Sequence, residues 1–188
     1  MIFLTDDEIK KINISNDFEF AESFNKNHCV THETKLIIVG TITPPAGAGY
    51  FYSAPRNRIY GYLDAFFKDT NLKELKKSLH INPENRNEIV SKIKEQLILK
   101  KVAFLDVIKF AIRKKDSYLD KDIKYCSLDF ESYKISSNAT INCNSTDAYN
   151  CLCQICKKLN IEPSKNIYLS QRFGTKIEWL KTFESILD

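Results

Sequence analysis

The segment from Gly40 to Phe67 contains the residue types that a ligand-binding loop needs. It follows the apolar run KLIIVG and reads GTITPPAGAGYFYSAPRNRIYGYLDAFF, with glycines, prolines, tyrosines and arginines close together. Glycine lets the backbone turn tightly and approach a ligand, and the stretch from Gly40 to Pro45 has this character. The glycine spacing matches neither the phosphate-binding G-x-x-x-x-G-K-[ST] loop nor the dinucleotide G-x-G-x-x-G motif. We therefore expect a binding loop that is not one of these two nucleotide loops.

Four short apolar segments are predicted to be strands, and helical patterns separate them. The strand candidates are Thr34–Thr41, Lys100–Ile108, part of Tyr133–Asn142, and Lys165–Ser170. Apolar runs of this length, rich in β-branched residues, are typical of buried parallel strands. Helical spacing of apolar residues predicts helices over residues 6–28, 58–69, 71–100, 145–160 and 175–187.

Strands that alternate with helices favour an α/β fold with three α/β/α layers around a short, mainly parallel four-stranded sheet. The length of 188 residues suits a single domain, with an N-terminal helical extension over residues 1–33 and a helical insertion over residues 70–100. Ligands in such folds bind at the carboxyl ends of the strands. The loops expected at that edge are Thr41–Arg58, Asp106–Asp122, Asn142–Thr146 and Ser170–Lys176.

Composition indicates which partners and which cellular location to expect for the protein. A formal net charge of +4 and a pI near 8.6 are compatible with a polyanionic partner but do not require one. The N-terminus lacks the basic region and long apolar region of a signal peptide, and no run approaches about 18 apolar residues. We therefore expect a soluble, cytoplasmic protein that does not associate with membranes, in which the six cysteines stay reduced.

The cysteines Cys151, Cys153 and Cys156 form a C-x-C-x-x-C pattern inside a predicted helix. At 100° per residue, the first two thiols point about 200° apart, so the three cannot face one metal ion. Buried small apolar side chains are the better interpretation. The three histidines show no ligand spacing, and we expect neither a metal nor a cofactor.

Four blocks resemble the uracil-DNA glycosylase superfamily, and they are most similar to its hypoxanthine-DNA and mismatch-specific branches. The block VGTITPP…GYFYSAPRNRIYGYL is similar to a strand ending in G-x-x-P, an aromatic residue, a P-x-N element and a helix. VAFLDVIKFAIRKKDSYLDKDI resembles the strand-Asp and R-x-G-S-x-D-x-x-I element, and TINCNSTDAY the base-reading I-x-F-N-G-x-x-A strand. IYLSQRFGTKIEWL takes the place of the final L-P-S-[TS]-S-P segment. The resemblance covers roughly Lys35 to Leu180.

This resemblance implies catalytic roles for Asn57 and Thr43. Thr43 stands where many members carry the Asn or Asp that positions or activates the hydrolytic water. A threonine can hold a water by hydrogen bonds but cannot act as a carboxylate base. Asn57 matches the asparagine of the P-R-N element that takes over this role in the hypoxanthine-type branch, so the chemistry is expected to depend on Asn57.

The resemblance also implies a base-binding set. Tyr52 matches the aromatic residue that stacks on the extruded base, with Phe51 or Tyr50 as alternatives, and Gly40 belongs to the same set. Asn144 matches the asparagine that reads the base edge, because an amide offers both a donor and an acceptor. The residues expected to face DNA phosphates are Arg56, Arg58, Ser170, Arg172 and Lys176, and those expected to support the site are Asp106 and Ser117.

The function implied is that of a monofunctional DNA glycosylase. The protein, expected to be a monomer, would flip a deaminated or modified base out of duplex or single-stranded DNA and hydrolyse its N-glycosidic bond. The final block lacks the usual proline, however, and Ser145 replaces the usual glycine after Asn144. The alternative is therefore a catalytically weak or inactive glycosylase-fold module that binds a nucleotide or nucleic acid.

Simpler roles fit several of the same residues. Asn57 and Asn144 each precede a predicted helix and are suited to cap it. Tyr52 is suited to ordinary packing, Thr43 to a turn, and Asp106 to anchoring loops through hydrogen bonds to backbone amides.

Overall fold

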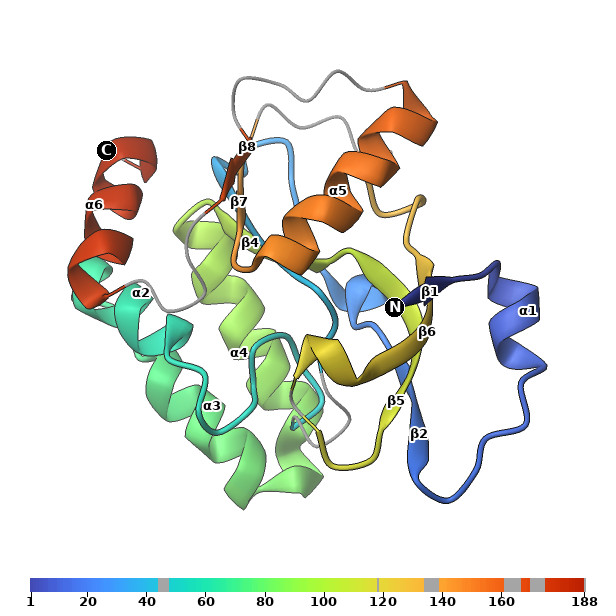
Figure 1. Ribbon diagram of the computed structural model, residues 1–188. Coiled ribbons are helices and arrows are strands. Elements are labelled where there is room, and N and C mark those ends of the chain that lie inside the picture. The colour runs from blue at the N-terminus through green and yellow to red at the C-terminus, as the bar shows by residue number, and fades with distance from the viewer. Residues whose placement is uncertain (44–47, 118, 134–138, 161–166, 170–174, 188) are drawn as a thin grey trace.

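The computed structural model describes residues 1–43, 48–117, 119–133, 139–160, 167–169 and 175–187. Figure 1 shows helices arranged around two sheets. The strands are β1 (Ile2–Phe3), β2 (Phe18–Glu22), β3 (Leu36–Gly40), β4 (Val102–Asp106), β5 (Ile108–Lys114), β6 (Ile123–Leu128), β7 (Thr140–Cys143) and β8 (Ile167–Leu169). The α-helices are α1 (Asp6–Lys10), α2 (Ile59–Phe67), α3 (Leu72–Ile81), α4 (Arg86–Leu99), α5 (Thr146–Leu159) and α6 (Lys176–Leu187). Short 3-10 helices are η1 (Asn25–Asn27), η2 (Pro83–Asn85) and η3 (Asp120–Asp122).

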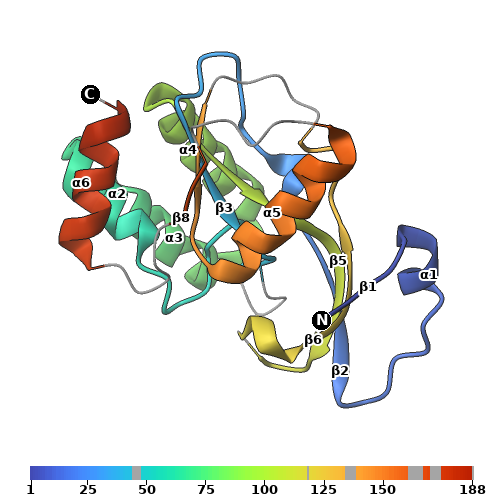
Figure 2. The same cartoon turned by 45° about the horizontal axis from the view of Figure 1, so that its top comes forward.

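The first sheet is parallel and has the strand order β4-β3-β7-β8. Three of the four strands fall within segments that the sequence predicts to be strands, and β7 extends one residue beyond its predicted segment, to Cys143. Figure 2 shows α5 on one side of this sheet and α2, α3 and α4 on the other. The side chains of β3 and β4 are buried throughout, as expected for a parallel strand covered on both faces.

A second sheet, which the sequence analysis does not predict, corrects the expected architecture. Its order is β1-β6-β5-β2, and it is mixed: β1 runs parallel to β6, whereas β5 runs antiparallel to both β6 and β2. The class is α/β, but the chain contains two sheets rather than one mainly parallel sheet. The expected loop over Asp106–Asp122 is wrong over Ile108–Lys114, because the apolar run continues past Val107 and pairs as β5.

The predicted helix over residues 6–28 is also wrong. Within residues 1–33 only α1 is α-helical, and β1, β2 and η1 make up the other assigned elements. Phe18 and Phe20 alternate with polar Glu19, which is the period of a strand, and β2 pairs with β5 over five residues. Long-range pairing outweighs the local helical tendency of this polar segment.

The segment between the loop after β3 and the start of β4 is helical, as predicted. It consists of α2, α3 and α4, with η2 at the break before Pro83. Proline cannot continue the i to i−4 hydrogen-bond ladder of α3, so the chain turns there and α4 starts afresh.

One large hydrophobic cluster joins the two sheets. It contains Ile38 and Phe104 of the parallel sheet, Ala111 and Cys126 of the mixed sheet, and Phe183 of α6. All six cysteines are free thiols, and five of them are buried. No helix in the described part of the chain is long and apolar enough to cross a bilayer.

Candidate functional site at the carboxyl edge of the parallel sheet

The carboxyl ends of β3 and β4 meet side by side, with Gly40 paired to Asp106. Beyond them the chain is held by two further hydrogen bonds, from Val107 N to Gly40 O (3.0 Å) and from Ile108 N to Thr41 O (3.0 Å). These bonds carry the chain from β4 into β5 while keeping it against the end of β3. The start of the loop that follows Gly40 is therefore fixed to both sheets.

Asp106 is the buried acid of this edge, with only 2% of its surface exposed. Its Oδ2 accepts hydrogen bonds from the backbone N of Thr43 (3.1 Å) and from Thr43 Oγ1 (3.3 Å). Burial raises the pKa of the Asp106 carboxyl to about 7, the two Thr43 bonds oppose that rise, and the charges of Asp120 and Asp129 add to it. Asp106 thus both anchors the loop and is poised to exchange a proton near neutral pH.

Asn25 of η1 holds the end of β4 in place. Its Nδ2 donates to Asp106 O (2.8 Å) and to Asp129 Oδ2 (2.7 Å), and its Oδ1 accepts from Asp106 N (2.8 Å). Asp129 is held in turn by the hydroxyl and backbone N of Ser132. No local sequence pattern marks Asn25, Asp129 or Ser132 as a group that supports Asp106.

Thr41 connects two other loops of the same edge. Its Oγ1 donates to Asp120 Oδ2 (2.9 Å) and lies 3.1 Å from Ser145 Oγ. Ser145 Oγ also accepts from Ala148 N (3.1 Å), which caps the N-terminus of α5. The loops after β3 and β7 and the connection before β6 therefore converge at this edge, as the α/β topology predicts.

Gly40 permits a close approach that another residue would block. A Cβ on Gly40 would lie 2.9 Å from Tyr52 Oη and 3.0 Å from Asp106 Oδ1. Tyr52 has a φ of 52°, a left-handed conformation that is uncommon for an aromatic residue, and its ring packs edge-on against Phe104 at 5.0 Å. An unusual backbone here places the Tyr52 hydroxyl directly over the end of β3.

The hydroxyls of Tyr52 and Tyr133 are buried at this edge, and neither has a hydrogen-bond partner among the residues that the structure describes. Burial raises the pKa of both phenols well above the usual value. The charge of Asp106 raises the pKa of each phenol further, and Cys143 and Tyr52 also raise the pKa of Tyr133. The four side chains therefore lie close enough to interact electrostatically. The sequence analysis does not identify Tyr133.

Tyr50 and Phe51 are fully buried beside Tyr52. Their rings meet edge to face at 5.2 Å, and Phe51 also contacts Phe24 and Phe104. The structure therefore places Phe51 in the hydrophobic core, although the resemblance makes it an alternative base-stacking residue. The hydroxyl of Tyr60 in α2 donates to Phe51 O (2.7 Å) and fixes this part of the loop.

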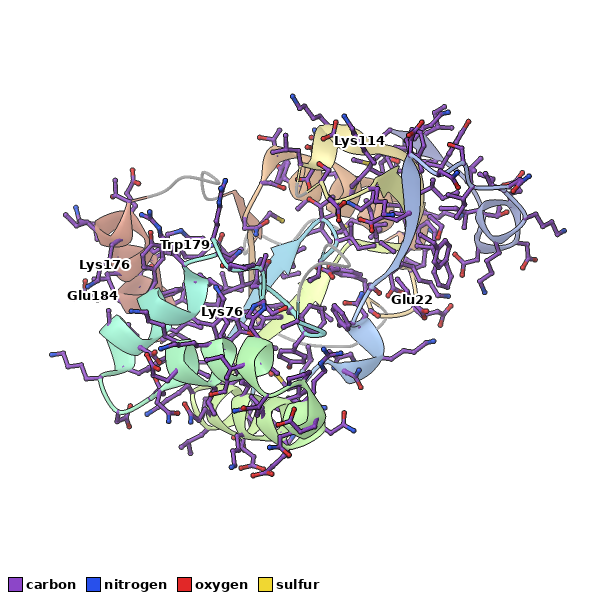
Figure 3. The ribbon with its side chains drawn as sticks, turned by 90° about the horizontal axis from the view of Figure 1, so that it is seen from below. Glu22, Lys76, Lys114, Lys176, Trp179 and Glu184 are labelled. Carbon is purple, nitrogen blue, oxygen red and sulfur yellow. The ribbon has the colours of Figure 1, made fainter. Side chains whose placement is uncertain are left out.

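Asn57 caps α2 in this structure. Its Oδ1 accepts from Ile59 N (3.0 Å), while no described residue bonds to its Nδ2. The loop around it is fastened to α3: Lys76 Nζ donates to Asn57 O (2.5 Å) and Pro55 O (3.3 Å). Figure 3, seen from below, shows Lys76 close to this loop. Lys76 is only 7% exposed, and burial lowers its pKa to about 8.

Asn144 does not cap α5, because Ser145 does. Its backbone N donates to Val39 O (2.9 Å), which extends the pairing of β7 with β3. No described residue bonds to its half-buried side-chain amide. The amide of Asn144 is therefore available to a ligand at the carboxyl edge.

The expected phosphate contacts are only partly described. Arg56 and Arg58 are exposed on either side of Asn57, and Lys176 is exposed at the start of α6. Ser170 and Arg172 lie outside the described residues. Ser117 Oγ donates to Asp122 Oδ2 (2.6 Å) and accepts from Leu119 N, so it stabilises the connection between β5 and β6.

In the described segments, no three His, Cys, Asp or Glu side chains form a group that could hold a metal ion. The carboxylates of Asp106 and Asp129 are instead engaged by Thr43, Asn25 and Ser132. The site derived from the described residues therefore consists of hydrogen-bonding and acid-base groups.

A solved structure has the same overall arrangement of elements. It is the solution NMR structure of a candidate uracil DNA glycosylase from Methanosarcina acetivorans, which superposes with a TM-score of 0.54. The alignment covers 89% of this chain and 98% of that one, at 14% sequence identity. The fold is uracil-DNA glycosylase-like. No family model matches the sequence, and no curated protein matches it.

Within this glycosylase-like fold, the strand end that carries Gly40 and the strand end that carries Asp106 are neighbours. An identity of 14% supports the fold and says nothing of the branch or of individual residue roles. The roles of Thr43, Tyr52, Asn57 and Asn144 are thus argued from the geometry of this chain.

Proposed function

We propose that the protein is a monofunctional DNA glycosylase that hydrolyses the N-glycosidic bond of a deaminated or modified base flipped out of DNA. The observation that carries this proposal is the pair formed by Thr43 and Asp106 at the carboxyl edge of the parallel sheet. Thr43 cannot act as a base by itself, and the buried carboxylate that it contacts supplies the missing proton acceptor.

The chemistry follows from the position of this pair. Asp106 Oδ2 is occupied by Thr43, whereas no described residue donates to Oδ1. A water held by Thr43 Oγ1 and Asp106 would add its oxygen to C1′ of the sugar while the C1′–N bond breaks, and its proton would pass to Asp106. The pKa of Asp106, raised to about 7 by burial, is suited to this transfer at neutral pH.

The leaving base needs groups that stabilise its developing negative charge. The hydroxyl of Tyr52 and the side-chain amide of Asn144 have no hydrogen-bond partner among the described residues, and both lie at the same edge. Each can donate a hydrogen bond to a carbonyl oxygen or ring nitrogen of the base. They are our candidates for base recognition, with Asn57 Nδ2 as a further donor.

DNA would reach the site across exposed arginines. Arg56 and Arg58 flank Asn57 in the sequence, and both side chains are exposed. Guanidinium groups bind phosphates well, and a net charge of +4 assists the approach of a polyanion. We propose Lys176, Ser170 and Arg172 as further phosphate contacts.

One observation favours the second function, a module that binds a nucleotide or nucleic acid without cutting it. Phe51 and Tyr52, the residues expected to stack on an extruded base, are 0% and 8% exposed. An extruded base would have to displace packed aromatic rings before it could stack. If the rings do not move, the protein would bind nucleic acid through its exposed arginines without hydrolysing a glycosidic bond.

Base excision is tested directly with oligonucleotides that contain uracil, hypoxanthine, xanthine or hydroxymethylated bases. After incubation with the protein, alkali converts each abasic site to a strand break. We expect breaks with the wild type that Asp106→Asn and Asn144→Ala abolish and that Asn13→Ala, at an exposed position between α1 and β2, leaves unchanged. Binding without breaks on every substrate would instead establish the second function.

Asn57 requires a separate comparison because it also caps α2. Asn57→Ala removes both the cap and the amide, whereas Asn57→Asp keeps an oxygen that accepts from Ile59 N. If the Nδ2 group acts on the substrate, both variants lose excision. If only the cap matters, Asn57→Asp retains it.

A further inference from the structure

A cavity of about 370 Å³ opens between α4, η1 and the loop after β3. Its polar lining comes mainly from Arg86, Asn87, Ser91 and Lys94 of α4, with Asn27 and Gly49 on the opposite wall. None of these residues belongs to the candidate site. The cavity adjoins that site through the chain, because Tyr52 follows Gly49 by three residues and Asn25 precedes Asn27 by two.

The two cations of this cavity have no partner within the described part of the chain. Neither Arg86 nor Lys94 forms an ion pair or a side-chain hydrogen bond there. Other lysines at the same helix are paired: Lys92 with Glu88 (2.5 Å) and Lys100 with Asp69 (2.6 Å). The unpaired positive charges of Arg86 and Lys94 thus both lie on the side of α4 that lines the cavity.

Gly49 places Arg86 against the loop. Gly49 has a φ of 83°, and a Cβ there would lie 2.9 Å from Arg86 Cδ and 3.1 Å from Nε and Nη1. Only a glycine both adopts this conformation readily and leaves room for the guanidinium. The arginine therefore lies directly on the backbone of the segment that carries Tyr52.

Lys94 lies two helical turns further along α4 and points toward η1. Its charge contributes to lowering the pKa of His28 after the larger effect of burial, and it also acts on Cys29. Glu95 lines the same end and accepts from Ser91 Oγ (3.1 Å). An anion would therefore bind toward Arg86, away from the carboxylate of Glu95.

We infer that this cavity binds a phosphate group of the DNA strand whose nucleotide occupies the candidate site. Arg86 offers a planar pair of donors to phosphate oxygens, Asn27 and Asn87 offer neutral donors, and Lys94 adds a second positive charge. Arg86 is also the first residue of α4, where the helix dipole favours an anion. The inference rests on the proposed function for the source of the phosphate.

The test compares Arg86→Gln and Lys94→Gln with Lys92→Gln, which removes an equal charge from α4 outside the cavity. Dissociation constants for single-stranded and duplex oligonucleotides are measured by fluorescence anisotropy at several salt concentrations. We expect Arg86→Gln to weaken binding roughly tenfold, as for loss of a charge-assisted hydrogen bond. The salt slope for single strands should fall by about 0.7 for one lost phosphate contact. Arg86→Lys, which keeps the charge, should restore part of the affinity.

Separate titrations with inorganic phosphate and with the oligonucleotide, followed by the NMR shift of the Gly49 amide, identify the source of the phosphate. A shift with phosphate but none with the oligonucleotide would overturn the inference. So would a dissociation constant that changes no more in Arg86→Gln than in Lys92→Gln. If base excision persists in that case, the proposed function still stands. If affinity depends on Arg86 but no substrate is cut, the phosphate site stands and the hydrolytic function fails.

Discussion

Tyr52 Oη and Asp106 Oδ1 both lie beside Gly40, within 2.9 and 3.0 Å of the position that a Cβ there would take, and no hydrogen bond joins them. A buried hydroxyl without a partner costs about 1–3 kcal/mol. The end of β3 thus keeps one unsatisfied hydroxyl beside a carboxylate with a raised pKa. A polar atom of a substrate, or a water, placed between the two oxygens would satisfy the hydroxyl.

Gly40→Ala should destabilise the protein through a contact with Tyr52. The new methyl group would crowd Tyr52 Oη, and crowding of this kind in a packed site costs about 1–3 kcal/mol. Tyr52→Phe removes the nearest atom, so the loss should be smaller in the double variant. Urea unfolding of the four proteins gives the coupling free energy directly.

Gly61→Ala is the matched control for this experiment. Gly61 lies inside α2, and the nearest atom to its added Cβ is Lys73 Cδ at 3.6 Å, an ordinary contact. Alanine should therefore stabilise α2 by up to about 1 kcal/mol. Strictly additive effects of Gly40→Ala and Tyr52→Phe would show that the hydroxyl is not the obstacle.

Removing the hydroxyl of Tyr52 or Tyr133 should stabilise the protein, whereas removing the hydroxyl of Tyr60 should destabilise it. Tyr52→Phe and Tyr133→Phe each delete a buried hydroxyl that has no partner in the described part of the chain, and each should raise the free energy of unfolding by about 1 kcal/mol. Tyr60→Phe deletes a hydroxyl that donates to Phe51 O at 2.7 Å and should lower it by a similar amount. Chemical denaturation of the three variants measures these signs, and a loss of stability in Tyr52→Phe would mean that its hydroxyl has a partner in solution.

Strands β3 and β4 of the parallel sheet could be predicted because each is a short apolar run between polar or glycine-containing segments. β3 and β4 are buried on both faces, so nearly every residue in them is apolar. β2 could not be predicted in the same way. Phe18 and Phe20 lie in an otherwise polar segment, and that segment becomes a strand through pairing with β5, about ninety residues later in the chain.

The same limit applies to the candidate site. Gly40, Thr43 and Asp106 are recognisable from the strand ends that carry them. Asn25 bonds to Asp129 across 104 residues of sequence, and Thr41 bonds to Asp120 across 79. No local pattern marks such partners, because each is defined only when two distant loops meet in the folded chain.

Asp106 should make stability depend on pH. Its folded pKa of about 7 lies above the ordinary value of 3.8, so between these values the folded state binds a proton that the unfolded state has lost. Stability therefore falls as pH rises from about 4 to 7. Asp106→Asn should remove this slope and be more stable than the wild type at pH 8, on the order of 4 kcal/mol. Unfolding free energies at pH 5 and pH 8 measure the effect.

The rate of base excision should also depend on the ionisation of Asp106, but it should increase with pH, whereas the stability of the fold decreases. A general base must be deprotonated, so kcat/KM should rise with pH through about 7. Asp106→Glu, which keeps a carboxylate in a different position, should retain a rising pH profile with a shifted midpoint. A wild-type profile that is flat from pH 5 to 8 would exclude Asp106 as the base.

Lys76→Met should loosen the loop that carries Asn57 while leaving the fold largely intact. The methionine keeps the buried apolar stem but removes the donor to the carbonyls of Pro55 and Asn57. Loss of an unfavourably buried charge offsets part of the lost hydrogen bonding, so the free energy of unfolding should change by only about 1 kcal/mol. The backbone N–H of Asn57, which donates to Ala54 O at 3.0 Å, should exchange with solvent severalfold faster.

Lys77→Met, at an exposed position of α3, controls for the loss of a charge from that helix. Hydrogen exchange followed by mass spectrometry compares the loop peptides of both variants with the wild type. Excision should decline in Lys76→Met in proportion to the loss of protection, since Asn57 must be held still to act on a substrate. Equal protection in the two variants would show that the bonds from Lys76 do not position the loop, and the bonds made by Tyr60, His80 and Asn57 would then be sufficient to hold it.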